Sequence, residues 1–178
     1  MKFAAFFRNV NLGRANCPSK SQLEQAFLDA GATDAASFLV NGTLVFSAPA
    51  ARGDRVLRSA VAQLEQVCGL KEPAFLRRVD DLATLVAIEP FAAIDRAAVY
   101  ECCVTFLAPR AAALPALPMS SRRGDVELLA RTQGEVFSVS RKLGNTPGSP
   151  NALLEKITAA SATTRAWNTL ARLVARHA

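Results

Sequence analysis

Two polar segments in the first half of the chain carry side chains that could bind an anion. The first, residues 8–18, reads RNVNLGRANCP and follows a short apolar run at residues 2–7. The second surrounds Asn41-Gly42, a pair that strongly predicts a tight hairpin turn. Guanidinium groups and side-chain amides donate the hydrogen bonds that carboxylates and phosphates accept. The candidate ligand-binding residues in these segments are Arg8, Asn9, Asn11, Arg14, Asn41 and Thr43.

Strand topology decides whether these two segments can meet. If the first half folds as β-α-β-β-α-β, its first two strands run parallel, so the loop that leaves the first strand shares one end of the sheet with the hairpin. The alternative is ordinary loop structure, in which the asparagines satisfy turns and the arginines are solvated. The sequence leaves both interpretations open.

A second candidate anion site lies at residues 141–156, RKLGNTPGSPNALLEK. The segment crosses a loop rich in Gly, Pro and Asn and ends inside an amphipathic helix. The first backbone N–H groups of a helix have no intrahelical partner, so a helix start with nearby cations can hold an anion. The candidates are Arg141, Lys142, Asn145 and Ser149. The alternative is that Ser149 caps the helix and Pro150 occupies its first position, which accounts for the same residues.

The residue types needed for common catalytic and metal sites are scarce. Serine and cysteine nucleophiles need a base, and the only histidine, His177, is the penultimate residue. No CxxC spacing, GxGxxG fingerprint or P-loop is present. We therefore expect no catalytic residues, no metal and no cofactor, although an enzyme that works without histidine stays open. The four cysteines are Cys17, Cys68, Cys102 and Cys103.

The composition is that of a globular protein with a basic charge balance. The chain has 178 residues, of which 51% are hydrophobic and 20% are charged, and its formal net charge is +6. A chain of this length buries roughly 70% of its unfolded-state surface without a metal or disulfide. A basic balance can indicate a nucleic-acid partner. The arginines are dispersed, however, and one Trp and one Tyr offer no base-stacking platform.

The N-terminal residues and the lengths of the apolar runs bear on location. The first residues, MKFAAFFRNV, contain only a short apolar run before Arg8, which is not typical of a signal peptide. No apolar run approaches the roughly 18 residues of a membrane span. We expect a cytoplasmic protein with reduced thiols, no membrane partner, and a monomeric or homodimeric state.

Hydrophobic periodicity and turn residues predict the order β-α-β-β-α-β for the first half, which is the ferredoxin-like arrangement. A further helix begins at Asp80 or Asp81. The predicted strands cover residues 2–7, 37–40, 43–48 and 73–79, and the predicted helices run from Ser19 or Ser21 to Gly31 and over residues 52–68.

The second half repeats much of this order. Its strands are predicted at residues 99–107, 125–131 and 135–140, with a short helix at 110–118 and a longer one from Ser149. A last helix from near Thr163 stands where a fourth strand would be. The prediction is an α+β protein with two ferredoxin-like halves, residues 1–92 and 93–178, the second having a C-terminal helix in place of the last strand.

Several segments in this order resemble an uncharacterised bacterial family, domain of unknown function 1697. The resemblance implies an α+β fold of two ferredoxin-like halves and implies no reaction. The chain departs from the family pattern at Asn9 and Arg14, which stand where glycines are usual, at Asn41 in the hairpin, and at Ser149-Pro150, where Ser-Lys is usual. The segments that carry the resemblance are RNVNLG at residues 8–13, TLVFS after Gly42, VTFL at 104–107, GEVF at 134–137, and ALLEK with ATTRAWNTLARL at 152–172.

These observations lead to a functional hypothesis with two alternatives. The hypothesis is a non-catalytic binder of an anionic small molecule or nucleotide that uses its loops. The alternatives are a nucleic-acid-binding protein with dispersed arginines and a histidine-independent enzyme.

Overall fold

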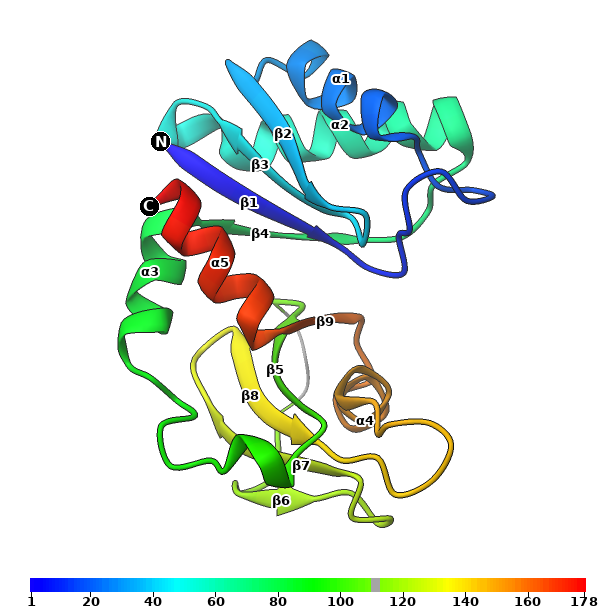
Figure 1. Cartoon of the computed structure of the whole chain (residues 1–178). Helices are drawn as coiled ribbons and strands as arrows, with labels where there is room; N and C mark the ends of the chain where they lie inside the picture. The colour runs from blue at the N-terminus through cyan, green and yellow to red at the C-terminus, as the bar shows by residue number, and fades with distance from the viewer. Residues whose placement is uncertain (110–112) are drawn as a thin grey trace. The chain divides into compact units, whose positions relative to one another are not determined.

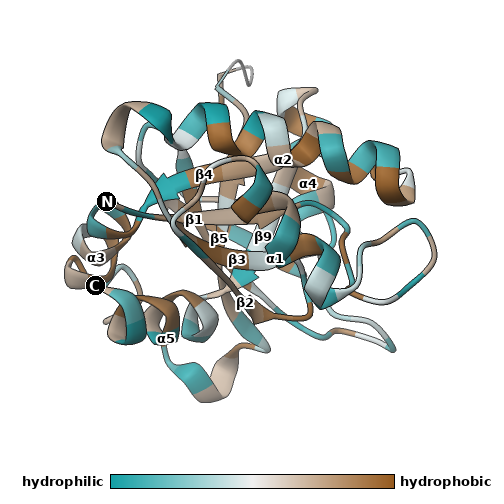
Figure 2. Cartoon of the chain, turned by 90° about the horizontal axis from the view of Figure 1, so that it is seen from above, coloured by the Kyte–Doolittle hydropathy of each residue, from teal (hydrophilic) through white to brown (hydrophobic). Residues whose placement is uncertain are grey.

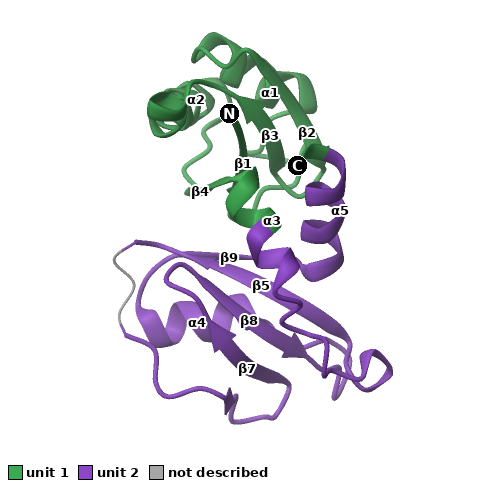
Figure 3. Ribbon diagram, turned by 90° about the vertical axis from the view of Figure 1, so that its left-hand side faces the viewer, with its two compact units in different colours: residues 1–83, 177–178 green, residues 84–176 purple. Residues whose placement is uncertain are grey.

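The computed structural model describes residues 1–109 and 113–178 (Figure 1). The chain forms two compact units, shown in different colours in Figure 3. Unit 1 comprises Met1–Ala83 with His177–Ala178, and unit 2 comprises Thr84–Arg176. The predicted boundary after residue 92 stays a prediction, and each unit is described by itself below.

Unit 1 contains an antiparallel four-stranded sheet with strand order β2-β3-β1-β4. The register places Phe3 opposite Phe46 and Ala5 opposite Leu44. The helices α1 and α2 lie on one face of this sheet (Figure 1). The elements in chain order are β1 (Lys2–Phe7), α1 (Lys20–Asp29), β2 (Asp34–Leu39), β3 (Thr43–Ser47), α2 (Gly53–Cys68) and β4 (Ala74–Arg78), and α3 (Val79–Ala87) follows β4 directly.

Aromatic side chains form the centre of the unit 1 core. Phe27 of α1 packs with its ring centroid 4.9 Å from that of Phe46 and 6.2 Å from that of Phe7. Alternate β1 residues face the helices because successive strand residues point to opposite faces. Helix α2 contributes an apolar stripe and ends at Gly69, which adopts the left-handed conformation that glycine tolerates best. Figure 2 shows hydrophobic and hydrophilic residues mixed along α2, as expected of an amphipathic helix.

Unit 2 contains a five-stranded antiparallel sheet with strand order β6-β7-β8-β5-β9. Leu154 of α4 packs with Val126, Leu128 and Val136 of the sheet. Phe137 therefore points to the opposite face, where its ring packs with those of Phe91 and Trp167. The elements are β5 (Glu101–Leu107), β6 (Met119–Ser120), β7 (Val126–Arg131), β8 (Glu135–Ser140), α4 (Pro150–Thr158), β9 (Ala162–Ala166) and α5 (Trp167–His177), preceded by the short helix η2 (Arg96–Ala98).

The predicted ending of the second half is wrong. The last helix does not begin near Thr163 and does not replace a strand, because β9 precedes it and α5 begins at Trp167. Strand β9 pairs antiparallel with β5 from Cys103–Ala166 to Leu107–Ala162. The hydroxyl oxygens of Thr105 and Thr164 lie 2.8 Å apart across this pair. The β-branched threonines favour a strand, and pairing with β5 satisfies its backbone.

The short helix predicted at residues 110–118 is wrong for the residues of that segment that the structure describes. Residues 110–112 lie outside the described residues, and residues 113–118 contain no helix. The prolines in this segment remove backbone donors and restrict the residues before them, which explains the absence of a helix there.

The two sheets share one strand order when β6 is set aside. In each unit the order is second, third, first and fourth strand, namely β2-β3-β1-β4 and β7-β8-β5-β9. A helix follows the fourth strand of each sheet without a loop, α3 after β4 and α5 after β9. The fold is therefore α+β, with two antiparallel sheets of related topology. Among residues 1–109 and 113–178, no helix is both long and apolar enough to cross a membrane.

Candidate functional site

The loop after β1 lies against the β2–β3 hairpin, as the predicted topology requires. The Phe7 N–H donates to the Gly42 carbonyl at 2.9 Å, and the Leu12 N–H donates to the Val40 carbonyl at 2.8 Å. Gly42 has a φ of +70°, and a Cβ atom added there would lie 2.7 Å from Cβ of Val10. Only glycine fits so close a contact at that backbone angle. Whether this loop and hairpin bind a ligand stays a prediction.

The predicted side chains of this region mostly have partners within unit 1. The Nη1 atom of Arg8 lies 2.6 Å from Oε2 of Glu72, and Nδ2 of Asn9 lies 3.4 Å from Oε1 of the same carboxylate. Thr43 is buried and donates its hydroxyl proton to Oδ1 of Asn41 at 2.8 Å. Asn11 and Arg14 are exposed. The positive charge of Arg8 is therefore matched inside the unit.

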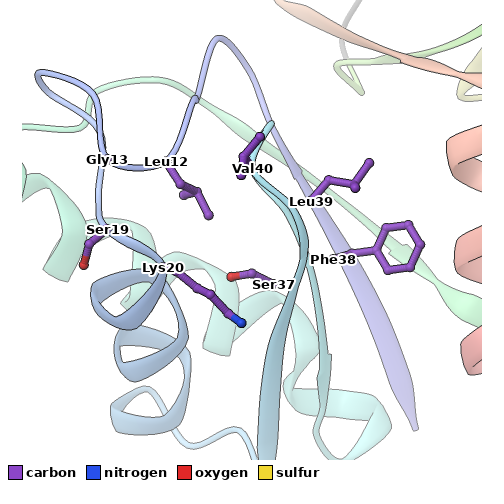
Figure 4. Close-up of a pocket in the computed structure, with 8 residues that line it drawn as sticks. All are labelled: Leu12, Gly13, Ser19, Lys20, Ser37, Phe38, Leu39 and Val40. Carbon is purple, nitrogen blue, oxygen red and sulfur yellow. The ribbon is translucent and has the colours of Figure 1, made fainter.

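A pocket of about 370 Å³ opens between the start of α1, this loop and β2 (Figure 4). In Figure 4, Leu12, Val40, Lys20 and Ser37 point into the space between α1 and β2, whereas Phe38 points away from it. Its apolar wall includes Leu12 and Val40, and its polar groups include the ammonium of Lys20 and the hydroxyl of Ser37. The remaining lining residues are Gly13, Ser19, Phe38 and Leu39.

The polar groups of the pocket are only partly satisfied. The Ser37 N–H donates to Oε1 of Glu24 at 2.8 Å. The Ser37 hydroxyl is buried and has no hydrogen-bond partner among the described residues. The Lys20 ammonium is largely exposed and lies 3.9 Å from Glu24 Oε1. The pocket thus presents a cation at its rim and an unsatisfied hydroxyl in its wall.

Helix α1 begins with a capping box that orients the pocket's basic residue. The Ser19 hydroxyl accepts the Gln22 N–H at 3.1 Å, and the Gln22 side chain accepts the Ser19 N–H at 2.8 Å. This cap fixes the entry to the helix, so Lys20 stands at its first position with the positive end of the helix dipole.

The prediction from sequence missed the lining residues of this pocket. It selected Asn11 and Arg14, whereas Leu12 and Gly13 between them line the pocket. Lys20 could have been selected as the cation beside the predicted cap Ser19. Ser37 carried no local signal, because only the packing of α1 beside β2 brings it to the pocket.

The second predicted segment, residues 141–149, forms a closed loop in unit 2. The Arg141 N–H donates to the Asp125 carbonyl at 2.8 Å, and the Gly148 N–H donates to the Arg141 carbonyl at 3.0 Å. Nη2 of Arg141 lies 2.9 Å from Oε2 of Glu127. The Ser149 hydroxyl accepts the Ala152 N–H at 3.2 Å, so it caps α4 as the alternative interpretation expected. The two remaining candidates, Lys142 and Asn145, are exposed.

The described residues also show how the possible metal ligands and the two thiols of β5 are placed. Within residues 1–109 and 113–178, no three His, Cys, Asp or Glu side chains are grouped so that they could hold a metal ion. Cys102 and Cys103 are buried free thiols. Burial raises the pKa of Cys103 to about 12, and the nearby charges of Glu101 and Cys102 act in the same direction. Such a thiol is protonated at neutral pH and is a poor nucleophile.

Comparison with known proteins gives the family and the fold. The chain resembles a solved structure, a conserved bacterial protein, SP0830, from Streptococcus pneumoniae, with a TM-score of 0.58 and 15% sequence identity. The match covers 98% of this chain and 97% of the other. No curated protein matches. A family model described as "Protein of unknown function (DUF1697)" matches residues 1–137, a range that ends before the resemblance noted at residues 152–172. The chain therefore belongs to the DUF1697 family.

Proposed function

We propose that this protein is a non-catalytic binder of a small molecule with one anionic group and an apolar body, and that the pocket beside α1 is its site. The observation that carries the proposal is the buried Ser37 hydroxyl without a partner among the described residues. A buried polar group without a hydrogen bond costs about 1–3 kcal/mol. A ligand that bonds this hydroxyl would recover that cost.

The charges around the pocket favour an anionic group at its rim. Lys20 supplies a flexible ammonium, and the first turn of α1 adds the positive end of a helix dipole. Glu24 opposes this charge, but its Oε1 atom accepts the Ser37 N–H and so has a structural role. The apolar wall of Leu12 and Val40 would contact the body of the ligand.

The size of the pocket narrows the ligand class. A volume of about 370 Å³ lies near the lower end of the roughly 300–1,000 Å³ typical of ligand pockets. A small carboxylate or phosphate monoester suits this volume better than a nucleotide.

We also infer that both units are variants of the ferredoxin-like arrangement. The inference is supported by their shared strand order and by the order β-α-β-β-α-β of unit 1. We further infer a bacterial cytoplasmic location, which rests on the bacterial source of the similar structure and on four free cysteines.

Thermal unfolding with hexanoate as the probe tests the proposed site. Hexanoate combines one carboxylate with an apolar tail, and binding to the folded state should raise the unfolding midpoint by linkage. Acetate, which lacks the tail, should raise it less at equal concentration and ionic strength. Equal effects of the two anions would contradict a pocket that holds an apolar body.

Two variants and one control separate the pocket from general charge. Lys20→Gln removes the rim cation, and Lys71→Gln removes an exposed lysine elsewhere in unit 1. Ser37→Ala removes an unsatisfied hydroxyl, so it should leave the free protein as stable or slightly more stable. We expect both pocket variants to reduce the hexanoate shift and the control to keep it. A full shift in Ser37→Ala would contradict the proposal.

Nucleic acid is a second candidate partner because of the exposed arginines on α2. Arg52 at the N-cap of α2 and Arg55 and Arg58 within the helix recur every third residue, and all three are exposed. Binding that uses these residues should weaken steeply with salt. A single-stranded oligonucleotide that does not bind would exclude this candidate. An affinity that stays the same between low and moderate salt concentration would exclude it as well.

A further inference from the structure

A second, more polar pocket lies wholly within unit 2. Its volume is about 220 Å³, and it forms where η2, the beginning of β5 and the first turn of α5 come together. None of the residues predicted from sequence to bind a ligand lines it. Its lining residues are Arg96, Val99, Tyr100, Glu101, Cys102 and Asn168.

The cation of this pocket, the guanidinium of Arg96, packs over the aromatic ring of Phe91. The guanidinium carbon of Arg96 lies 5.4 Å from the ring centroid of Phe91, within the range of a cation–π interaction. Phe91 is itself buried against Trp167, with ring centroids 5.2 Å apart, and against Phe137 at 6.0 Å. The Asp95 side chain accepts the Ala97 N–H at 2.9 Å and caps the short helix that carries Arg96.

The opposite charge comes from Glu101 at the start of β5. Burial raises the pKa of its carboxyl group, and the charge of Arg96 acts in the opposite direction. In the described part of the chain, no ion pair joins Glu101 to Arg96, so the two charges influence each other without direct contact. This small pocket therefore contains a cation and an anion that do not form an ion pair with each other.

The neutral groups between the charges can form hydrogen bonds with a ligand. Burial raises the pKa of the Cys102 thiol, while the charge of Arg96 and a hydrogen bond from it oppose that shift. Cys102 is thus a thiol that lines the pocket and is not an activated nucleophile. The Tyr100 hydroxyl and the Asn168 amide can each donate and accept. Asn168 stands in the first turn of α5, where the helix dipole favours a negative group.

We propose that this pocket binds a small zwitterion, a molecule that carries a carboxylate and an ammonium group. A simple anion would meet the repulsion of Glu101, and a simple cation would meet that of Arg96. A molecule with both charges can satisfy Arg96 and Glu101 together. The volume, below the roughly 300 Å³ of drug-sized pockets, suits a ligand of amino-acid size.

The aromatic residues of the chain provide a local readout. The single tryptophan, Trp167, packs against Phe91 beneath Arg96 and precedes Asn168. The single tyrosine, Tyr100, lines the pocket. Binding should therefore change the intrinsic fluorescence, with no label required.

The test titrates the full chain with glycine, β-alanine and 4-aminobutyrate, and with propionate and ethylamine as the separate halves. We expect a saturable fluorescence change with at least one zwitterion, and affinities at least about tenfold weaker for the halves, as expected when one charge-assisted contact is lost. Absence of saturation with every zwitterion would overturn the proposal, as would a half that binds as tightly as the best zwitterion.

Matched variants test whether the zwitterion binds at Arg96 and Glu101. Arg96→Gln and Glu101→Gln each remove one charge and keep a similar shape, and each should weaken the best zwitterion by about tenfold. Arg58→Gln and Glu65→Gln remove the same charges from exposed positions on α2 and should bind as the parent does. Unchanged affinity in both pocket variants, with unfolding midpoints showing that they are folded, would overturn the assignment. Hexanoate binding at the α1 pocket is measured separately, so the two proposals fail independently.

Discussion

Units 1 and 2 have the same strand order but differ in the helices that cover their sheets. Unit 1 has α1 between its first two strands and α2 between its third and fourth. Unit 2 has α4 in the position of α2, and the described residues between β5 and β7 form no helix, only the short strand β6. In the described residues, the two units therefore differ at the connection between their first two strands.

The difference between the connections goes with a difference in where each unit has its pocket. The pocket of unit 1 depends on the start of α1, which supplies Ser19 and Lys20. The residues of unit 2 that the structure describes at the matching connection form no helix, and the pocket of unit 2 lies at the start of β5 and of α5. The two pockets thus lie at different positions in the strand order that the units share.

The largest expected contrast is in cysteine reactivity. Cys17 and Cys68 of unit 1 are partly exposed, and Cys103 of unit 2 is buried with its pKa raised to about 12. A rise from 9.0 to about 12 lowers the thiolate fraction at pH 8 by roughly a thousandfold. Iodoacetamide labelling followed by peptide mass analysis should modify Cys17 and Cys68 first. Labelling of Cys103 in the folded protein at a comparable rate would contradict the burial of this strand.

The next largest effects are expected from substitutions in the hydrophobic cores of the two units, which should lower the free energy of unfolding. Phe27→Ala removes a ring that packs with Phe7 and Phe46 in unit 1, and the expected loss is about 3–5 kcal/mol. Leu154→Ala in unit 2 should lower the free energy of unfolding by about 2–5 kcal/mol, since this side chain of α4 is fully buried against the sheet. Urea unfolding measures both losses. A cost below about 1 kcal/mol in either variant would show that the corresponding core is not packed as described.

A smaller effect is expected from a glycine in the closed loop of unit 2. A Cβ atom at Gly148 would lie 2.2 Å from the Asp125 carbonyl oxygen, whereas nothing lies within 4 Å of one at Gly144. Gly148→Ala should lose about 1–3 kcal/mol because the backbone must shift. Gly144→Ala, in the same loop, should stay within about 0.5 kcal/mol of the parent. Equal stabilities of the two variants, measured by urea unfolding, would contradict the close contact.

The smallest expected effects on stability come from substitutions at the two helix caps. Ser19 and Ser149 both cap a helix, but Gln22 also returns a hydrogen bond to Ser19, whereas Ser149 is followed by Pro150. Each Ser→Ala change should cost about 1 kcal/mol. Thermal midpoints of the two variants test this, with Ser21→Ala, next to the first cap, as the control that should change little. A loss in the control equal to that of Ser19→Ala would contradict the capping role.

Local signals in the sequence predicted most of the fold. Gly31 and Gly69 ended helices, Ser149 capped one, and Asn41-Gly42 marked a hairpin, because each depends on a few neighbouring residues. Strand β9 was missed because its pairing with β5 involves residues about 60 positions away in sequence. Its start also adjoins the apolar pattern of α5, which extended the predicted helix too far. The first residues of β2, Asp34 to Ala36, have low strand propensity and pair because β3 lies beside them.

The candidate site was less predictable because it too depends on contacts between residues that are distant in sequence. Arg8 and Arg141 were selected as cations for a ligand, yet folding gives them the carboxylates of Glu72 and Glu127, the first 64 positions away. Lys20 and Ser37 come together only because α1 packs beside β2. Tertiary contacts, which periodicity does not encode, decided both outcomes.

A backbone NMR titration of isotopically labelled protein with hexanoate tests most directly whether the pocket beside α1 binds a small amphipathic anion. Binding there predicts saturable shifts of the Lys20, Ser37 and Val40 amides, with the amides of Lys142 and Asn145 unchanged. Shifts concentrated at residues 141–149, or spread over exposed lysines and arginines without saturation, would contradict it.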